Sequence, residues 1–185
     1  MAVVEFVAAG FRRAGVRSGI AALLGICVAA SPAISSAQEA KAAPSGQSLP
    51  RFVSLKSERV NMRKGPGEDY AVSWIYTRSG LPVEVVQEFD NWRRIRDAEG
   101  TEGWVFQGLL SGKRTAVIAP WEKGDPLAIH SSPDGKSRVT AYLQPGVLAA
   151  VSKCESGWCR LTDPRFIGWI EQDRLWGVYP DETIE

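Results

Sequence analysis

The sequence is poor in the side chains and motifs on which most catalytic sites depend. One histidine and three cysteines occur among 185 residues, and neither a Gly-x-Ser-x-Gly elbow nor a His-Glu-x-x-His motif is present. A nucleophilic cysteine needs a base within hydrogen-bond reach, and zinc needs a further ligand besides His130, Cys154 and Cys159. We therefore expect no catalytic residues, no metal site and no cofactor. A small redox or hydrolytic enzyme is kept as an alternative.

An excess of charge of one sign is also absent. The chain has 22 Lys and Arg against 21 Asp and Glu, which gives a formal net charge of +1. Residues 1–37 contain three arginines and one glutamate, so the remainder carries a net charge of −1. Proteins that bind nucleic acids usually present a strongly basic surface. We therefore expect no nucleic-acid partner.

No hydrophobic run is long enough to span a bilayer, which takes about 20 apolar residues. The apolar run at residues 20–30 lies instead in a stretch typical of a secretory signal peptide. Three arginines precede the run, and small residues follow it up to Ala37. We predict a signal peptide over residues 1–37, and hence an exported protein, periplasmic or extracellular, with no membrane segment after cleavage. An amphipathic helix or a membrane anchor is the alternative.

The segment after the predicted cleavage site has little capacity to fold. It reads QEAKAAPSGQSLP over residues 38–50 and consists mainly of small and polar side chains. Such a segment buries too little apolar surface to offset the entropy lost on ordering. We expect a flexible leader over residues 38–56.

Long amphipathic helical patterns are missing from the rest of the chain. Short segments rich in Val, Ile, Trp and Tyr alternate there with Gly, Pro, Asp and Asn, which is typical of an all-β protein. The strands that we predict in the first half are 57–63, 71–76, 83–89, 92–97 and 102–106. Those in the second half are 126–130, 138–143, 147–153, 158–162 and 166–171.

The second half of this pattern repeats the first. Matching segments recur in the same order at intervals of 65 to 67 residues: VNMR at 60–63 with LAIH at 127–130, NWRRI at 91–95 with GWCRL at 157–161, and GWVFQGLL at 103–110 with GWIEQDRL at 168–175. Each unit spans roughly 50–55 residues, which is large for a solenoid repeat. The repeat therefore indicates two tandem domains.

We infer that these domains are small β-barrels. Domain 1 covers residues 57–112, and the more divergent domain 2 covers residues 124–177. A connecting segment at 113–123 joins them, and a C-terminal tail follows at 178–185. A barrel of this size has a marginal hydrophobic core, to which large aromatic side chains add buried area. Packing in the core or between domains is therefore the alternative to a binding role for most of the tryptophans.

Several of these motifs resemble those of the bacterial SH3-like domain. They are the opening Val60-Asn61-Met62-Arg63, the Gly65-Pro66 turn, Trp92 in a hairpin and Gly103-Trp104-Val105 in the last strand. The resemblance covers residues 57–112 well and 124–177 more loosely, because the second opening reads Ala128-Ile129-His130 and its turn Ser132-Pro133. The resemblance implies SH3-like barrels that act as non-catalytic binding modules of the cell envelope. Their expected partner is peptidoglycan or an envelope protein or peptide.

The loop KGPGEDY at residues 64–70 could be a phosphate cradle or a corner of the barrel. A cradle of that kind ends in Lys-Ser/Thr and leads into a helix, and neither feature follows here. Pro66 also removes one backbone donor. We predict a corner, in which Gly65 and Gly67 supply unusual backbone angles and the chain delivers Tyr70 and Trp74 to a binding surface.

The candidate ligand-binding residues are Arg63, Tyr70, Trp74, Trp92 and Trp104. The aromatic rings would stack on sugar or peptide groups, and Arg63 would pair with a carboxylate of the ligand. A reader of proline-rich peptides and an oligomerisation scaffold are alternatives. The sequence gives no indication of the oligomeric state.

The segment CESGWC at residues 154–159 predicts a disulfide. A two-residue Ser-Gly turn places Cys154 opposite Cys159, where the Cα atoms of facing residues lie about 4.5 Å apart, within disulfide range. Export to an oxidising compartment favours the bond, and two reduced thiols are the alternative. Glu88 and Arg93 face each other at the same place in the first repeat, so an ion pair is expected there.

Overall fold

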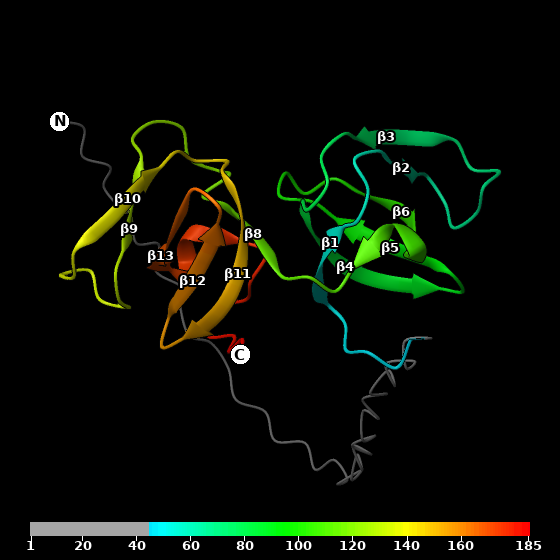
Figure 1. The fold of residues 1–185 in the computed structure, drawn as a ribbon. Coiled ribbons are helices and arrows are strands. Elements are labelled where there is room, and N and C mark those ends of the chain that lie inside the picture. Colours follow the sequence, from blue (N-terminus) through cyan, green and yellow to red (C-terminus); the bar gives the residue numbers. More distant parts are fainter. Residues whose placement is uncertain (1–44) are drawn as a thin grey trace, which may run out of the picture. The chain divides into compact units, whose positions relative to one another are not determined.

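The computed structural model describes residues 45–185, which belong to one compact unit and form two β-barrels in tandem (Figure 1). The signal peptide predicted at residues 1–37 lies outside the described residues. Between residues 45 and 185, no helix is long and apolar enough to cross a membrane. The all-β fold and the duplication predicted from the sequence are both confirmed.

The first barrel is a seven-stranded antiparallel sheet with strand order β3-β2-β6-β5-β4-β1-β7. Its elements are β1 (Arg51–Leu55), β2 (Val60–Arg63), β3 (Val72–Tyr76), β4 (Pro82–Phe89), β5 (Trp92–Arg96), β6 (Glu102–Phe106), a 3₁₀ turn η1 (Gln107–Leu109) and β7 (Leu110–Ser111).

The second barrel repeats this plan with strand order β10-β9-β13-β12-β11-β8-β14. Both long strands even shift register at the equivalent place, between Val85 and Gln87 in β4 and between Val151 and Lys153 in β11. The elements are β8 (Thr115–Ile118), β9 (Leu127–His130), β10 (Val139–Leu143), β11 (Leu148–Glu155), β12 (Trp158–Asp163), β13 (Phe166–Glu171), η2 (Gln172–Arg174) and β14 (Leu175–Trp176).

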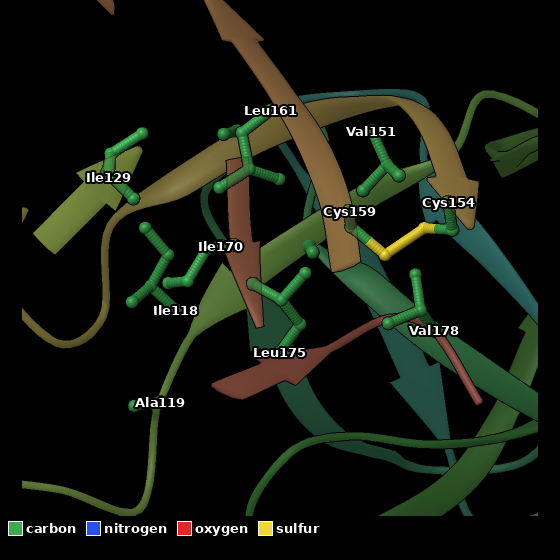
Figure 2. Close-up of a cluster of buried hydrophobic side chains, with 12 residues drawn as sticks. Ile118, Ala119, Ile129, Val151, Cys154, Cys159, Leu161, Ile170, Leu175 and Val178 are labelled. Carbon is green, nitrogen blue, oxygen red and sulfur yellow. A yellow bond between two sulfur atoms is a disulfide. The ribbon is translucent and has the colours of Figure 1, made fainter. Parts of the chain in front are cut away.

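Each barrel encloses its own apolar core, because alternate residues of the strands point inward. In β2, Val60 and Met62 are fully buried while Asn61 and Arg63 stay partly exposed. Burial of one aliphatic side chain stabilises the fold by about 1.5–3 kcal/mol. The second core contains Ile118, Ile129, Leu161, Ile170 and both cysteines (Figure 2).

The first strand of each barrel was not predicted from the sequence. β1 lies in the range that we expected to be a flexible leader (38–56), and β8 lies in the expected connecting segment (113–123). β1 gains its order by pairing with β4 and β7, and β8 by pairing with β11 and β14. Such pairing depends on partners far away in the sequence, so short strands like these carry little local signal.

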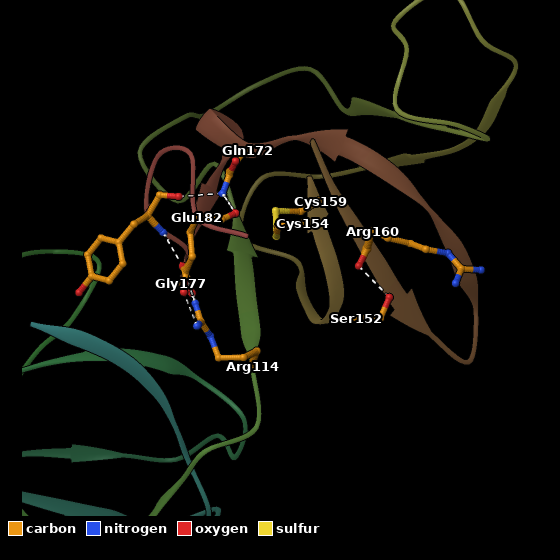
Figure 3. Close-up of a disulfide and its surroundings, with 9 residues drawn as sticks. Arg114, Ser152, Cys154, Cys159, Arg160, Gln172, Gly177 and Glu182 are labelled. Carbon is orange, nitrogen blue, oxygen red and sulfur yellow. Dashed lines mark hydrogen bonds and ion pairs between the residues drawn. A yellow bond between two sulfur atoms is a disulfide. The ribbon is translucent and has the colours of Figure 1, made fainter. Parts of the chain in front are cut away.

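The tail at residues 178–185 packs against the second barrel, a contact that the sequence did not indicate. Val178 is buried in the core, and Ile184 exchanges two backbone hydrogen bonds with Cys154, of 2.9 and 3.1 Å. The Arg114 guanidinium donates to both carboxylate oxygens of Glu182, at 2.6 and 2.9 Å, and to the Gly177 carbonyl (Figure 3). The tail is therefore part of the barrel wall.

The predicted disulfide joins Cys154 and Cys159, whose Cα atoms lie 4.1 Å apart on facing positions of β11 and β12 (Figure 3). At the matching position of the first barrel, Arg93 Nε lies 3.2 Å from a carboxylate oxygen of Glu88. The same rung is thus cross-linked by a covalent bond in one barrel and by an ion pair in the other, as the sequence predicted.

Glu88 is the centre of a buried polar cluster at this end of the first barrel. Its side chain has no exposed surface and accepts hydrogen bonds from the Ser45 N–H, the Ser45 hydroxyl and Arg51, at 2.6–2.9 Å. Burial opposes ionisation of Glu88, but these donors and the charge of Arg93 outweigh it and hold the pKa below its usual value. The carboxylate therefore stays charged inside the fold.

The two barrels contact each other through aromatic and polar side chains. The Trp176 ring packs edge-on against Phe52, with ring centroids 5.1 Å apart, and its Nε1 donates to the Pro82 carbonyl. The Tyr179 hydroxyl donates to a carboxylate oxygen of Glu84 at 2.8 Å. These contacts bring strands β1 and β4 of the first barrel against β14 and the tail.

Candidate functional site

Three of the five predicted site residues lie on one outer face of the first barrel. Arg63, Trp104 and Arg94 occupy facing positions on the neighbouring strands β2, β6 and β5. Trp92 faces Phe106 on the next rung. Because facing residues of antiparallel strands point to the same side of a sheet, these side chains form one continuous surface.

This surface contains a groove of about 270 Å³, which we call the first-barrel groove. Its apolar wall is formed by Trp92, Phe106 and Leu109, and the Trp92 and Phe106 rings meet edge to face with centroids 5.8 Å apart. Arg59 and Arg63 line it as well. Trp104 lies on the same face of the sheet beside the groove. An aromatic wall beside guanidinium groups suits a ligand with an apolar part and an anionic group.

Asn61 adds an unsatisfied acceptor to the groove. Its amide oxygen Oδ1 is buried and has no hydrogen-bond partner among the described residues. A buried amide oxygen without a partner costs free energy comparable to a lost hydrogen bond. A ligand that offers an N–H group, such as a peptide, would remove this cost after a small rearrangement of the side chain.

Arg63 also fixes the loop that borders the groove. Its Nη1 donates to the backbone carbonyls of Glu68 and Tyr70, at 2.8 and 2.7 Å. From the sequence, we expected Arg63 to pair with a ligand carboxylate. The structure adds a second role, in which the same side chain holds the loop at residues 64–71 in place.

The Gly-Pro loop is a corner, as predicted, and leads into strand β3. The reason for its glycines differs from the expectation, because neither Gly65 nor Gly67 has a positive φ angle. Instead, the Tyr70 ring lies directly on Gly65, where a Cβ atom would overlap it, and a Cβ on Gly67 would approach the ring to 3.3 Å. The glycines make room for Tyr70, which is half exposed.

Trp74 does not line the first-barrel groove. It lies on β3, the edge strand of the sheet, and 54% of its surface is exposed. It borders a separate hollow beside the second barrel. The five predicted residues are therefore divided among the groove and its face, the loop above it and this second hollow.

The second barrel has a hollow of about 290 Å³ at the equivalent position, but its chemistry has changed. Ala128 replaces Asn61, His130 replaces Arg63, Glu171 replaces Phe106 and Arg174 replaces Leu109. Arg174 pairs with Glu122 across this hollow at 2.7 Å. The aromatic wall of Trp92 and Phe106 and the unsatisfied amide thus have no counterpart in the lining of the second hollow.

Comparison with known proteins fits this architecture. The family model described as "Bacterial SH3 domain" matches residues 56–112 and 123–177, which together make up more than half of the chain. The chain belongs to the bacterial SH3 domain family. Each matched stretch begins just before the second strand of a barrel and ends at its last strand or just after it, so one domain corresponds to one barrel.

Relatives of these bacterial SH3 domains occur in longer proteins. A protein of Bacillus subtilis (strain 168), whose name describes it as an N-acetylmuramoyl-L-alanine amidase, is 23% identical over 126 residues. The match covers 64% of this chain and 24% of that protein. Among solved structures, NlpC1 and NlpC2 from Trichomonas vaginalis match with 15% and 14% identity and TM-scores of 0.31 and 0.32. The matches cover 72% and 69% of this chain and 48% of each of those chains.

Five further residues line the groove and were not predicted from the sequence: Arg59, Asn61, Glu68, Phe106 and Leu109. A signal for two of them was present in the repeat itself. Phe106 and Leu109 belong to the matched segments GWVFQGLL and GWIEQDRL, in which they are replaced by Glu171 and Arg174. A position that is apolar in one bacterial SH3 domain and charged in the other indicates a surface whose chemistry differs between the two barrels.

Proposed function

We propose that this protein is an exported, non-catalytic binding module of the bacterial cell envelope. Its ligand is a peptide segment of peptidoglycan or of an envelope protein, held in the first-barrel groove. The observation that carries this proposal is the combination of an aromatic wall, two arginines and an unsatisfied amide oxygen in one hollow. The relationship to a chain named as an amidase agrees with a role at the cell wall.

The chemistry of the described residues supports binding rather than catalysis. Cys154 and Cys159 are joined in a disulfide, so neither offers a thiolate nucleophile. His130 contacts the Ser137 carbonyl at 3.2 Å, and its ring packs edge-on against Trp158. Between residues 45 and 185, no three His, Cys, Asp or Glu residues are grouped so that they could hold a metal ion.

Within this proposal, Arg59, Arg63 and Asn61 supply the polar contacts to the ligand, while Glu68 also lines the groove. The guanidinium groups of Arg59 and Arg63 would attract a carboxylate of the peptide. The Asn61 amide oxygen would accept a backbone N–H, and Trp92 and Phe106 would cover an apolar side chain or the peptide plane. A peptide carries all three features within a few ångströms of one another.

Phe106→Ala is expected to weaken retention on purified peptidoglycan sacculi about tenfold. Truncation of an aromatic residue at the centre of a binding site usually costs more than about 1 kcal/mol, and about 1.4 kcal/mol corresponds to a factor of ten in affinity. Co-sedimentation with sacculi at low salt, over a range of protein concentrations, measures this change. The matched control is Glu171→Ala at the equivalent position of the second barrel, which should leave retention unchanged.

Two outcomes would contradict the proposal in different ways. Equal losses for Phe106→Ala and Glu171→Ala would show that the first-barrel groove is not the site. Absence of retention of the folded wild-type protein would refute peptidoglycan as the ligand. Photo-cross-linking from position 106 in cell-envelope extracts would then test the envelope-protein form, which requires a specific product that is lost with Arg63→Ala.

A further inference from the structure

A second hollow lies between the two barrels and is independent of the first-barrel groove. It has a volume of about 280 Å³ and shares no lining residue with that groove. We call it the inter-barrel cleft. Its aromatic lining consists of Trp74 and Tyr76 from β3 and Trp176 from β14, and its charged lining consists of Arg78, Asp97 and Glu99.

The walls of this cleft are fixed by hydrogen bonds within the protein. Trp176 is held by its Nε1 hydrogen bond of 3.2 Å to the Pro82 carbonyl. The Tyr76 hydroxyl donates to one oxygen of Asp97 at 2.9 Å. The other Asp97 oxygen accepts the backbone N–H groups of Glu99 and Thr101, at 3.1 and 2.9 Å. Little reorganisation is therefore needed before a ligand enters.

Trp74 is different, because its ring is an exposed wall without an aromatic partner among residues 45–185. More than half of its surface is in contact with solvent. An exposed tryptophan face beside an apolar hollow is an efficient surface for stacking or for a cation, because its ring face carries negative electrostatic potential.

The charges of the cleft favour a cation. The lining contains two carboxylates, Asp97 and Glu99, and one guanidinium, that of Arg78. Burial first, and then the neighbouring carboxylates of Asp97 and Glu99, raise the pKa of the Tyr76 phenol. A positive group placed between Trp74 and Glu99 would therefore be stabilised both by the ring and by the carboxylate.

We propose that the inter-barrel cleft binds a protonated amine at the end of an aliphatic chain, such as a lysine-type side chain of a peptide. The aliphatic part lies between Trp74 and Trp176, and the ammonium group lies next to Glu99. The volume is slightly below the range of roughly 300–1,000 Å³ that is typical of drug-sized ligand pockets. A hollow of this size suits one side chain rather than a whole ligand.

The test uses two probes that share a four-carbon side chain, Nα-acetyl-lysine amide, which ends in an ammonium group, and Nα-acetyl-norleucine amide, which lacks it. Each is titrated into the full exported chain while NMR follows the indole N–H signals of Trp74 and Trp176. The lysine probe should shift both signals saturably in the millimolar range, and the norleucine probe should not. Trp74→Ala should weaken binding of the lysine probe by about tenfold, and Glu99→Gln by about threefold.

Matched controls separate this site from the rest of the surface. Trp121→Ala removes another exposed tryptophan, which does not line the cleft, and should leave the titration unchanged. Phe106→Ala should also leave it unchanged, so failure of the first-barrel groove and failure of the cleft can be told apart. Equal binding of the norleucine probe, saturation by N-acetylglucosamine oligomers instead, or no saturable shift with the lysine probe would each overturn the proposal.

Discussion

Glu88→Gln is expected to lower the free energy of unfolding by about 3–5 kcal/mol, because it leaves a buried guanidinium without its counter-charge. The side chain of Arg93 is 6% exposed, and that of Arg51 is 19% exposed. Glutamine keeps the shape of the side chain but not its charge. The loss is a large part of the stability of a small domain. Urea unfolding followed by tryptophan fluorescence measures it.

The control for this variant is Glu122→Gln, which breaks the half-exposed ion pair with Arg174. An ion pair at the surface contributes about 0–1 kcal/mol, so the change should be small. Equal losses for Glu88→Gln and Glu122→Gln would show that the buried cluster has no special weight in the stability of the first barrel.

The same cluster makes stability depend on pH in a defined direction. The pKa of Glu88 is lower in the folded protein than its usual value. The contribution of Glu88 to the free energy of unfolding is therefore fully present above its pKa in the unfolded chain, which is about 4.3. This contribution is lost as the pH falls through the pKa of Glu88 in the folded protein. The free energy of unfolding of the wild-type protein should fall below about pH 4, and that of the Glu88→Gln variant should fall less steeply over the same range.

Gly177→Ala should be the second strongly destabilising change, with an expected loss of about 2–5 kcal/mol. Gly177 has a φ angle of +123°, and a Cβ atom there would overlap the Thr115 carbonyl oxygen. It would also lie 3.0 Å from Ala116 Cα and from Pro82 Cβ, which belongs to the first barrel. These atoms are backbone or rigid ring, so they cannot easily move aside.

Gly124→Ala separates backbone strain from steric overlap. Gly124 has a φ angle of +139°, but a Cβ atom there would meet nothing within 4 Å. This variant should therefore lose only the free energy that backbone strain costs, roughly 1–3 kcal/mol. This loss should be smaller than that of Gly177→Ala. If both variants lose the same free energy in chemical denaturation, close packing of residue 177 against β8 is not the reason why it is a glycine.

The central strands of both barrels could be predicted from the sequence, because their patterns are local. Alternation such as Val60-Asn61-Met62-Arg63 and the turn in CESGWC each identify an element within a few residues. The repeat then supplied the domain organisation, since the same anchors recur in order. β1, β8 and the tail carry no comparable local signal, and their order comes from pairing with distant strands.

The candidate sites were predictable only in part. The sequence identifies Arg63, Trp92 and Trp104 as candidates, and sheet register brings them to one face. The place of Leu109 in the groove, and that of the Asn61 oxygen without a hydrogen-bond partner, depend on how η1 and β2 are arranged in space. The inter-barrel cleft depends on both barrels at once, so no single segment of the sequence could predict it.

The tethered loop at residues 64–71 has a consequence for the thermodynamics of association. Arg63 ties two of its carbonyls, and the Tyr70 ring rests on Gly65. Such a loop has already lost most of its conformational entropy before any partner arrives, so docking incurs only a small ordering penalty. Calorimetry of ligand binding should then show only a small entropic cost from ordering of the protein. The Arg63→Ala variant should bind the same ligand with a more unfavourable entropy than the wild-type protein.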